Sequence, residues 1–423
     1  MSSTASARPG AAQPGPTTPG PAMSGWRTPI VVILAGCLIA MVGFGIRSSF
    51  GLFLEPMTVT HGWDRSTFGL AMAIQNLLWG IGVPVAGMIA DRYGPSRVLA
   101  VGAVVYTLGV WGMAHSPSVL GLHLFGGVLT GIGVAFTAFS LAMAAMAKVV
   151  GPERRSLALG LGTASGSFGQ VVFSPLGQSF IQQFGWESAL DILALSALLI
   201  IPLAFILPNI QSPKSEAQHD QSLGQALREA TNHRGFVLLT TGFFVCGFQV
   251  AFITVHFPAY VSDLGLDRSV GATALALVGF FNIAGSFGAG MFGQRFSKRT
   301  GLAWIYLLRS VATVGLLLAP KTDLTIYLFA GSIGLLWLST VPLTTGIVAQ
   351  VFGVRYMATL FGVVFLSHQL GSFAGVWLGG YLYDTTGSYD GVWWSSVVLG
   401  IIATVIHAVI DEKPLPRMTP AAA

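Results

Sequence analysis

Long apolar runs alternate with short polar segments along almost the whole chain. Twelve of these runs are long enough to cross a hydrocarbon core of about 30 Å as helices that rise about 1.5 Å per residue. They lie near residues 29–55, 66–90, 98–115, 119–148, 156–182, 188–207, 236–262, 270–293, 302–320, 324–351, 357–382 and 393–410. This pattern predicts an all-α membrane protein with twelve transmembrane helices.

One longer polar segment, residues 208–235, divides the runs into six and six. We therefore expect an N-terminal six-helix bundle over 26–207, a linker over 208–235 and a C-terminal six-helix bundle over 236–410. Within the linker, Leu223–Thr231 is expected to form a short surface helix.

The chain ends are expected to be polar tails, over 1–25 and 411–423. The first tail is rich in Pro, Gly, Ala, Ser and Thr and has no apolar core, so it is predicted to be disordered and is not a signal peptide. Met23 is an alternative start, which the sequence does not decide.

Basic residues are distributed unevenly between the two sets of loops. If the N-terminus is cytoplasmic, three basic residues fall on the outer side, Arg65, Arg268 and Lys321. The inner side then holds Arg8, Arg27, Arg92, Arg97, Lys148, Arg154, Arg155, Lys214, Arg228, Arg234, Arg295, Lys298, Arg299, Arg355, Lys413 and Arg417. The positive-inside rule therefore places both termini in the cytoplasm, in a multi-pass protein of the cell membrane.

Composition narrows the class of protein. Hydrophobic residues make up 53% of the chain and charged residues 9%, against about 25% charged in soluble domains. The formal net charge of +5 forms no contiguous basic face, so no nucleic-acid partner is expected. Cys37 and Cys246 lie inside apolar runs, and no metal spacing, disulfide framework, nucleophile–base pair or phosphate loop is present. We expect no cofactor, no metal and no enzyme activity.

The two halves of the chain repeat each other. A shift of 202 residues superposes small residues that belong to a loop and the fifth helix of each half. The matched pairs are Gly151 and Gly353, Gly160 and Gly362, Ser165 and Ser367, Gly169 and Gly371, Gly177 and Gly379, and Gly185 and Gly387. Parallel repeats of this kind are a transporter architecture, with the binding site at mid-membrane between the halves.

The loop after the second helix reads "GMIADRYGPSR", and it resembles the signature loop of the major facilitator superfamily. The matching residues are Gly87, Asp91, Arg92, Gly94 and Arg97. A weaker copy, "GMFGQRFSKR", follows the eighth helix, with Gln294 in place of the acid.

The resemblance implies twelve helices in two pseudo-repeats and a gating role for this loop. Asp91 would contact the N-terminus of a neighbouring helix, whose dipole favours an anion. The alternative is an ordinary loop in which Arg92 and Arg97 only set the topology.

Four ionisable residues fall inside the predicted helices: Arg47, Arg309, His256 and His368. A buried arginine costs at least about 2.5–3.5 kcal/mol on insertion scales, so each needs a partner or a function. No Asp or Glu lies at mid-membrane beside them. Because a carboxylate would supply the missing counter-ion, we predict an organic anion as substrate, with Arg47 and Arg309 as candidate ligands. The alternative is that each arginine snorkels or holds a structural contact.

Uncharged polar residues at similar depth extend the candidate site. We expect Gln75, Asn282 and His368 to assist in binding substrate, although hydrogen bonds between helices also explain such residues. The others at this depth are Asn76, Ser165, Ser167, Gln170 and Gln249. If a proton is co-transported, His368 or His256 is expected to carry it.

Within the superfamily, "GIRSSFGLFL", "HGWDRS" and "FGVVFLSHQLGSFAG" resemble the monocarboxylate porter and oxalate/formate antiporter branch. This resemblance implies a secondary transporter for a small monocarboxylate-type anion, functional as a monomer, with proton coupling left open. Relatives carry a cation in the eighth helix, which residues 270–293 lack.

The alternative is a proton-coupled drug exporter of the same fold. Exporters of that kind carry an arginine before a Gly-x-Gly in the fourth helix, and Gly127 occupies that position here. A membrane enzyme or a receptor-like sensor is the third hypothesis. It lacks catalytic residues and an appended soluble domain.

Overall fold

The computed structural model describes residues 27–150, 155–208, 222–353 and 355–416, and no strand occurs in these ranges. The first half of the chain forms α1 (Pro29–Ser48), the 3₁₀ turn η1 (Phe50–Phe53), α2 (Leu54–His61), α3 (Arg65–Tyr93), α4 (Pro95–His115), α5 (Val119–Gly121), the π-helical η2 (Leu122–Leu129), α6 (Thr130–Phe136), α7 (Phe139–Val149), α8 (Arg155–Ala197) and α9 (Ile200–Ile206). The expected tail over 1–25 lies outside the described residues.

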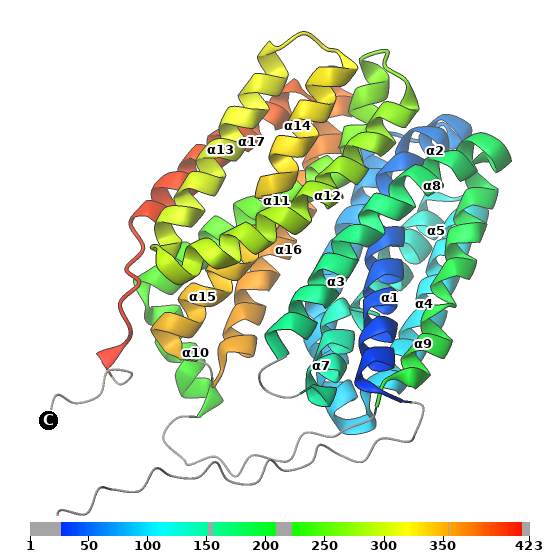
Figure 1. Cartoon of the computed structure of the whole chain (residues 1–423). Coiled ribbons are helices and arrows are strands. Elements are labelled where there is room, and N and C mark those ends of the chain that lie inside the picture. The colour runs from blue at the N-terminus through cyan, green and yellow to red at the C-terminus, as the bar shows by residue number, and fades with distance from the viewer. Residues whose placement is uncertain (1–26, 151–154, 209–221, 354, 417–423) are drawn as a thin grey trace, which may run out of the picture.

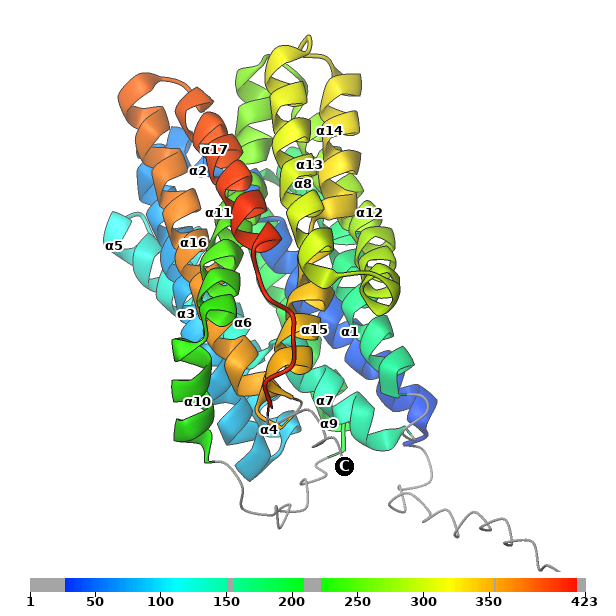
Figure 2. The same ribbon diagram turned by 90° about the vertical axis from the view of Figure 1, so that its left-hand side faces the viewer.

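The second half begins with α10 (Leu223–Asn232) and continues with α11 (Arg234–Asp263), α12 (Arg268–Arg295), α13 (Lys298–Leu318), α14 (Asp323–Leu336), α15 (Thr340–Phe352), α16 (Met357–Thr386) and α17 (Asp390–Ala408). A short helix does occupy the place predicted for it in the linker. Ser222 begins it with a capping box, in which its side chain and that of Gln225 each satisfy the other's backbone N–H. Figure 2 shows α10 at the lower edge of the bundle, where it contacts α11.

Eleven helical segments of the described chain are long and apolar enough to cross a membrane. One of them, Ala158–Ile206, has 49 residues, about twice what a 30 Å core requires. It is broken at Gly185, whose φ of 83° a residue with a Cβ rarely adopts. The segment is therefore two spans, and the prediction of twelve transmembrane helices is confirmed.

The helices form two groups that lie side by side, α1–α9 and α10–α17 (Figure 1). The groups are joined mainly where α3 packs on α16, α8 packs on α12 and η1 packs on α11. At Gly380 of α16 an added Cβ would lie 2.6 Å from the backbone of Ser66, and at Gly279 of α12 it would lie 2.8 Å from the carbonyl of Ser167. Glycine thus allows the backbones of the two halves to approach closely.

The halves separate toward one end of the molecule. This end, at which α1 begins and to which the segment after α17 returns, is named the terminus-bearing end (Figure 1). Among the described residues, no atom lies within 4 Å of a Cβ added at five glycines on this half of the crossing helices: Gly87, Gly160, Gly288, Gly290 and Gly362. At the other end, named the closed end, side chains of the two halves are in direct contact.

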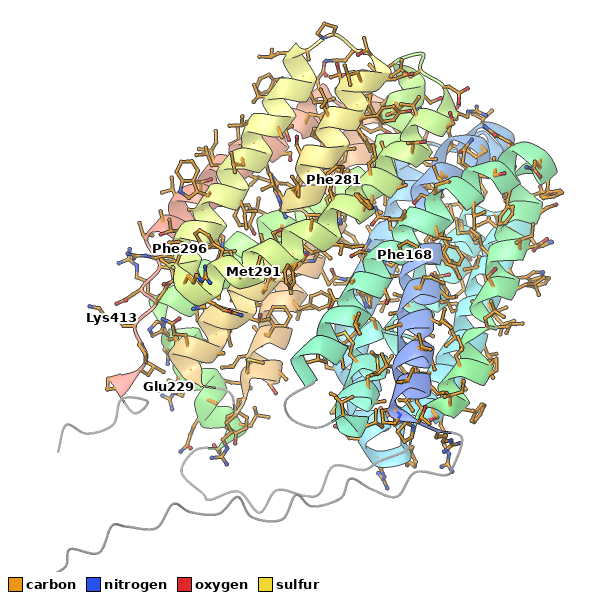
Figure 3. All side chains as sticks on the ribbon, in the orientation of Figure 1. Phe168, Glu229, Phe281, Met291, Phe296 and Lys413 are labelled. Carbon is orange, nitrogen blue, oxygen red and sulfur yellow. The ribbon has the colours of Figure 1, made fainter. Side chains whose placement is uncertain are left out.

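Large apolar side chains cover the outside of the bundle. Phe168, Met291 and Phe296 are 49%, 51% and 62% exposed and project outward (Figure 3). Leu120 and Leu318 are more than 70% exposed. Monomeric soluble proteins rarely expose so much contiguous apolar surface, so this belt is the lipid-facing surface of a membrane protein.

Candidate functional site

Arg47 lies in the last turn of α1, where the helix is interrupted. The hydroxyls of Ser48 and Ser49 donate to the carbonyls of Gly45 and Ile46 at 2.8 and 2.7 Å. The chain then tightens into η1. These bonds satisfy carbonyls at the end of α1, and the guanidinium of Arg47 reaches Asn76 and Trp79 of α3.

Neutral groups surround the Arg47 guanidinium. Its Nη2 donates to Oδ1 of Asn76, and its Cζ lies 4.4 Å from the ring centroid of Trp79 and 5.9 Å from that of Phe44. Aromatic faces attract a cation through their quadrupole. Within the described ranges no acid forms an ion pair with Arg47. Its charge is therefore stabilised by dipoles and rings, without a counter-ion.

Asn76 links Arg47 to the other half of the molecule. Its Nδ2 donates to the carbonyl of Met72 at 2.8 Å, which turns Oδ1 toward Arg47. Its backbone carbonyl accepts from Nε2 of Gln369 at 2.8 Å. The Oε1 of Gln369 lies 2.8 Å from Nδ1 of His368. A path of polar contacts thus joins Arg47 on α1 to His368 on α16.

A row of rings follows the same path. Trp79 meets Phe365 edge to face at 5.4 Å between centroids, and Phe365 stacks on His368 at 5.7 Å. Trp79 belongs to the first half and the other two rings to the second. The structure thus places Arg47 and His368, both predicted site residues, at the junction of the halves.

Beside Arg47 lies a small half-open cavity of about 20 Å³, room for about one water molecule. Its lining residues are Ala40, Gly43, Phe44, Arg47, Trp79, Val134, Thr137, Ala138 and Phe139. The hydroxyl of Thr137 donates to the carbonyl of Gly133 at 2.8 Å, and Arg47 is the charged residue among those that line the cavity. The buried Nε of Arg47 has no hydrogen-bond partner among the described residues.

Arg309, the second buried arginine, is held differently. Its Nη2 donates to the carbonyls of Leu336, at 2.7 Å, and Trp337, and its Nε donates to Leu336 at 3.2 Å. These carbonyls end α14, where the helix dipole favours a cation. Its Nη1 lies 3.3 Å from Oε1 of Gln249. Arg309 is 2% exposed and lines a separate small cavity inside the second half.

Gln75 and Asn282 both have protein partners. The Nε2 of Gln75 donates to the carbonyl of Gly126 at 3.1 Å, within the first half. Asn282 donates to Ser167 at 2.8 Å across the two halves and accepts from the backbone N–H of Leu338 at 2.9 Å. The structure does not bring either amide to Arg47, and their predicted contact with substrate stays a prediction.

His256 lies near the closed end and is fully buried. Its Nε2 is 2.7 Å from the carbonyl of Val376, and its Nδ1 is 3.1 Å from the hydroxyl of Tyr389. Burial raises the pKa of Tyr389, so its hydroxyl stays protonated. The hydroxyl then donates a hydrogen bond to Nδ1 of His256. Both ring nitrogens of His256 are therefore engaged in contacts that hold the second half together.

Arg65 connects the two halves at the closed end. Its guanidinium forms two bonds with the carboxylate of Asp263, at 2.6 and 2.7 Å, and donates to the hydroxyl of Tyr389 at 3.0 Å. It also lies 3.7 Å from the ring centroid of Tyr383. A second ion pair, between Arg268 and Glu55 at 2.6 Å, joins the halves beside it.

Asp384 adds a helix cap between the halves. The first N–H groups of α3, those of Arg65 and Ser66, donate to its carboxylate at 3.0 and 2.8 Å. Asp64, the N-cap residue of α3, makes no side-chain capping bond. An acid of the second half therefore satisfies the start of a helix in the first half.

The signature loop lies at the terminus-bearing end. Gly94 ends α3 with a φ of 89°, a conformation that favours glycine, and Pro95 begins α4. Asp91, Arg92 and Arg97 are exposed. No ion pair of Asp91 is found among the described side chains, and its predicted contact with a helix terminus stays a prediction.

Several residues that lie between Arg47 and His368 in the structure were not among the site residues predicted from the sequence. Trp79, Phe365 and Gln369 line the path from Arg47 to His368, and Asn76 takes the place expected for Gln75. A signal for Asn76 and Trp79 existed, because residues three apart lie on one helix face. No signal along the chain could pair Arg65 with Asp263 and Asp384, because these residues meet only after folding.

No cluster of three or more His, Cys, Asp or Glu side chains suited to a metal ion occurs in the described ranges. The chemistry that the described side chains offer at this junction is recognition of an anion by Arg47.

Comparisons with known proteins agree with this architecture. The family model described as Major Facilitator Superfamily matches residues 33–376. An MFS-type transporter of Bacillus subtilis, YcxA, is 26% identical over 87% of this chain and 90% of its own length. Monocarboxylate transporter 13 of Rattus norvegicus is 25% identical over 92% of this chain and 89% of its own length.

Among solved structures, a bacterial homologue of the human lysosomal transporter Spinster has the same fold. Its TM-score is 0.74 at 15% identity, over 93% of this chain and 100% of that one. The similarity of fold and sequence extends over nearly the whole length in each comparison. The chain is a multi-pass membrane transporter that belongs to the major facilitator superfamily.

Proposed function

We propose that this transporter moves a small organic anion of the monocarboxylate type, with Arg47 as the group that binds the carboxylate. The observation that carries the proposal is the state of Arg47: a guanidinium at the junction of the halves, with an unpartnered Nε and no acid as counter-ion. The edge of a guanidinium matches the geometry of a carboxylate and binds it through two parallel hydrogen bonds.

The distribution of basic residues supports one orientation in the membrane. Arg92, Arg97, Arg295 and Arg299 lie at or near the terminus-bearing end, whereas Arg65 and Arg268 lie at the closed end. The positive-inside rule assigns the terminus-bearing end to the cytoplasm of a cell membrane. On this assignment the structure is open toward the cytoplasm and closed toward the outside.

Alternating access would require the contacts between the halves at the closed end to break while the terminus-bearing end closes. At the closed end, Arg65, Asp263 and Asp384 must separate before substrate can enter from outside. The terminus-bearing end would then close, and Asp91 would meet a helix N-terminus. Rocking of the two halves about the junction of α3 with α16 performs this exchange.

His368 is the group proposed to carry a proton, if one is coupled. It is 7% exposed and lies beside the substrate path, with Nδ1 bonded to Gln369. An imidazole can accept and release a proton at a ring nitrogen, which is the chemistry that proton coupling requires. His256 is proposed to serve the outer gate instead, because both its ring nitrogens are engaged there.

Counterflow in proteoliposomes tests the proposal. Purified protein would be loaded with unlabelled compound and assayed for uptake of labelled acetate, lactate, benzoate and cationic drugs. Accumulation of a carboxylate that is lost in Arg47→Gln supports the proposal. Uptake of a cation with no response to any carboxylate would instead support a proton-coupled drug exporter.

A further inference from the structure

The imidazole of His256, on α11, is buried where the two halves of the molecule meet near the closed end. A Cβ added at Gly379 of α16 would lie 2.8 Å from Cδ2 of the ring, and one added at Gly69 of α3 would lie 3.7 Å from its Nε2. Gly69 belongs to the first half, whereas His256 and Gly379 belong to the second. Separation of α3 from α16 at the closed end would therefore bring solvent to this ring.

The hydrogen bonds around His256 run in one direction and fix the protonation of the ring. The carbonyl of Val376 can only accept, so Nε2, at 2.7 Å, carries a hydrogen and donates it. The guanidinium of Arg65 can only donate, so the hydroxyl of Tyr389 accepts from it at 3.0 Å. The hydrogen of that hydroxyl then points to Nδ1 of His256 at 3.1 Å. Nδ1 must accept it, so the closed arrangement requires a neutral imidazole.

A second hydrogen on the ring does not fit this arrangement. An N–H at Nδ1 would face the oxygen of Tyr389, which already accepts from Arg65. The hydroxyl would have to turn its own hydrogen away, and a buried donor without an acceptor is costly. The charged imidazole would also lie close to the guanidinium of Arg65, and two cations in a poorly solvated site repel each other. Protonation of His256 therefore weakens the closed end.

The charged and titratable side chains that face His256 come from three elements: Arg65 from α3, Asp384 from α16 and Tyr389 at the start of α17. Asp263, on the same helix as His256, pairs with Arg65. Asp384 favours a proton on the ring by its charge, but its carboxylate is bonded to the first N–H groups of α3. The group that contacts Nδ1 is instead the hydroxyl bonded to Arg65, so the cationic side of this cluster faces Nδ1. Two further tyrosines contact the ring of Tyr389, Tyr260 and Tyr383.

We propose that His256 is a proton-binding site that controls the closed end. The end closes when the imidazole is neutral and opens when Nδ1 takes up a proton from solvent. A solvated histidine titrates at about pH 6.5. The closed end is therefore favoured above about pH 6.5 and weakened as the pH falls below that value. The inference concerns the gate, and it does not depend on the substrate or on binding of a carboxylate by Arg47.

Pulsed EPR distances across the closed end test this inference in lipid nanodiscs, where both faces of the protein meet the same pH. Spin labels would be attached to cysteines introduced at Val59 of α2 and Leu324 of α14, which are 74% and 65% exposed and lie on opposite halves. The chain without introduced cysteines gives the background from Cys37 and Cys246. From about pH 7.5 to about pH 5.5, the ratio of open to closed molecules should rise about tenfold, because the open form binds one proton as a solvated histidine does.

Variants of His256 separate this site from other groups that titrate in the same range. His256→Asn keeps an oxygen that can accept from Tyr389 but takes up no proton, so the response to pH should fall below about twofold. If His256→Asn does not fold, His256→Gln, which keeps a donor for the carbonyl of Val376, gives the same comparison. His115→Asn is the matched control, because His115 also lies at the closed end but approaches Asp191 of its own half, at 3.6 Å. It should keep the full response.

Loss of the response in the His256 variants, with the response kept in His115→Asn, supports the inference. Distances that do not change with pH in the unmodified chain would overturn it. A tenfold response that persists in both His256→Asn and His256→Gln would overturn it as well. Neither result bears on the proposed function, which the counterflow assay with Arg47→Gln tests separately.

Discussion

The two arginines buried in the bundle differ in what stabilises their charge. Arg309 is saturated by the carbonyls that end α14 and by Gln249. Arg47 has one neutral oxygen, two rings and an unpartnered Nε. The first arrangement leaves no donor for a ligand, whereas the second leaves the buried Nε of Arg47 without a partner among the described residues. Burial of a cation is therefore a weak sign of a binding site, and an unfilled set of donors is a stronger one.

Arg65 shows a third arrangement, in which acids of the protein supply the counter-ion. Asp263 accepts both of its hydrogen bonds, and this pair bridges the two halves. Because the partner belongs to the other half, the contact is made in one conformation and broken in another. The three arginines thus differ in partner: Arg47 has neutral groups, Arg309 has helix-end carbonyls, and Arg65 has acids of the other half.

The largest effect is expected from removing the cation that lacks a counter-ion. Arg47→Gln should lower carboxylate uptake by roughly 1,000-fold, since loss of a charged partner costs about 2–5 kcal/mol in a buried site. The thermal midpoint of the detergent-solubilised protein should stay within a few degrees, because few protein groups depend on Arg47. A large fall in that midpoint would show that Arg47 is structural.

The reverse outcome is expected for Arg309. Arg309→Leu should destabilise the protein by roughly 3 kcal/mol, because it leaves buried helix-end carbonyls without donors. Fluorescence-detected gel filtration after heating would show the loss as a lower midpoint. Protein that remains folded should keep a half-saturation concentration close to that of the unmodified chain. A stable variant with no uptake would assign Arg309 to the substrate.

A smaller effect should follow when Arg47 is given a counter-ion of its own. Asn76→Asp places a carboxylate where Oδ1 of Asn76 now lies, and it would compete with substrate for the guanidinium. We expect KM for carboxylate to rise about tenfold, equivalent to about 1.4 kcal/mol of binding free energy.

Gln75→Leu is the matched control for that variant, since the amide of Gln75 bonds to Gly126 rather than to Arg47. It should leave KM unchanged. If KM rises in Gln75→Leu and not in Asn76→Asp, then Gln75 is the substrate ligand and Asn76 is not.

The smallest effect concerns Arg65. Asp263→Asn should weaken the closed end by about 1 kcal/mol, because a partly exposed ion pair contributes little. The outward-open population should rise about fivefold, measured as faster labelling, from the outside, of a cysteine introduced below Arg65. Glu55→Gln is the control, and its effect should be smaller because Arg268 is about half exposed. No change in either variant would mean that the helix cap by Asp384 alone holds this end.

The sequence could predict features that depend on neighbouring residues along the chain. Apolar runs of sufficient length gave twelve spans, and the family signature around Asp91 gave the fold. Arg47 and His368 were predicted as site residues from their place inside apolar helices, and the structure brings both to the junction of the halves. Their roles in transport remain predictions.

Depth along a helix does not fix direction around it relative to other helices. Gln75 and Asn76 are adjacent and equally deep, yet one faces Gly126 within the first half and the other faces Arg47. A rotation of about 100° per residue separates them. Which side meets a cavity is decided by packing between helices that are distant in the chain.

The sequence by itself determined that this protein lies in a lipid bilayer, and it determined the number of membrane-spanning helices. The reason is that the transfer of apolar residues and charges between water and lipid depends mainly on composition and spacing. Only the tertiary structure decided which buried cation is satisfied and which is free. The partners that decide it, such as Leu336 for Arg309 and Asp263 for Arg65, are 27 and 198 residues away. They come together only when the helices have packed.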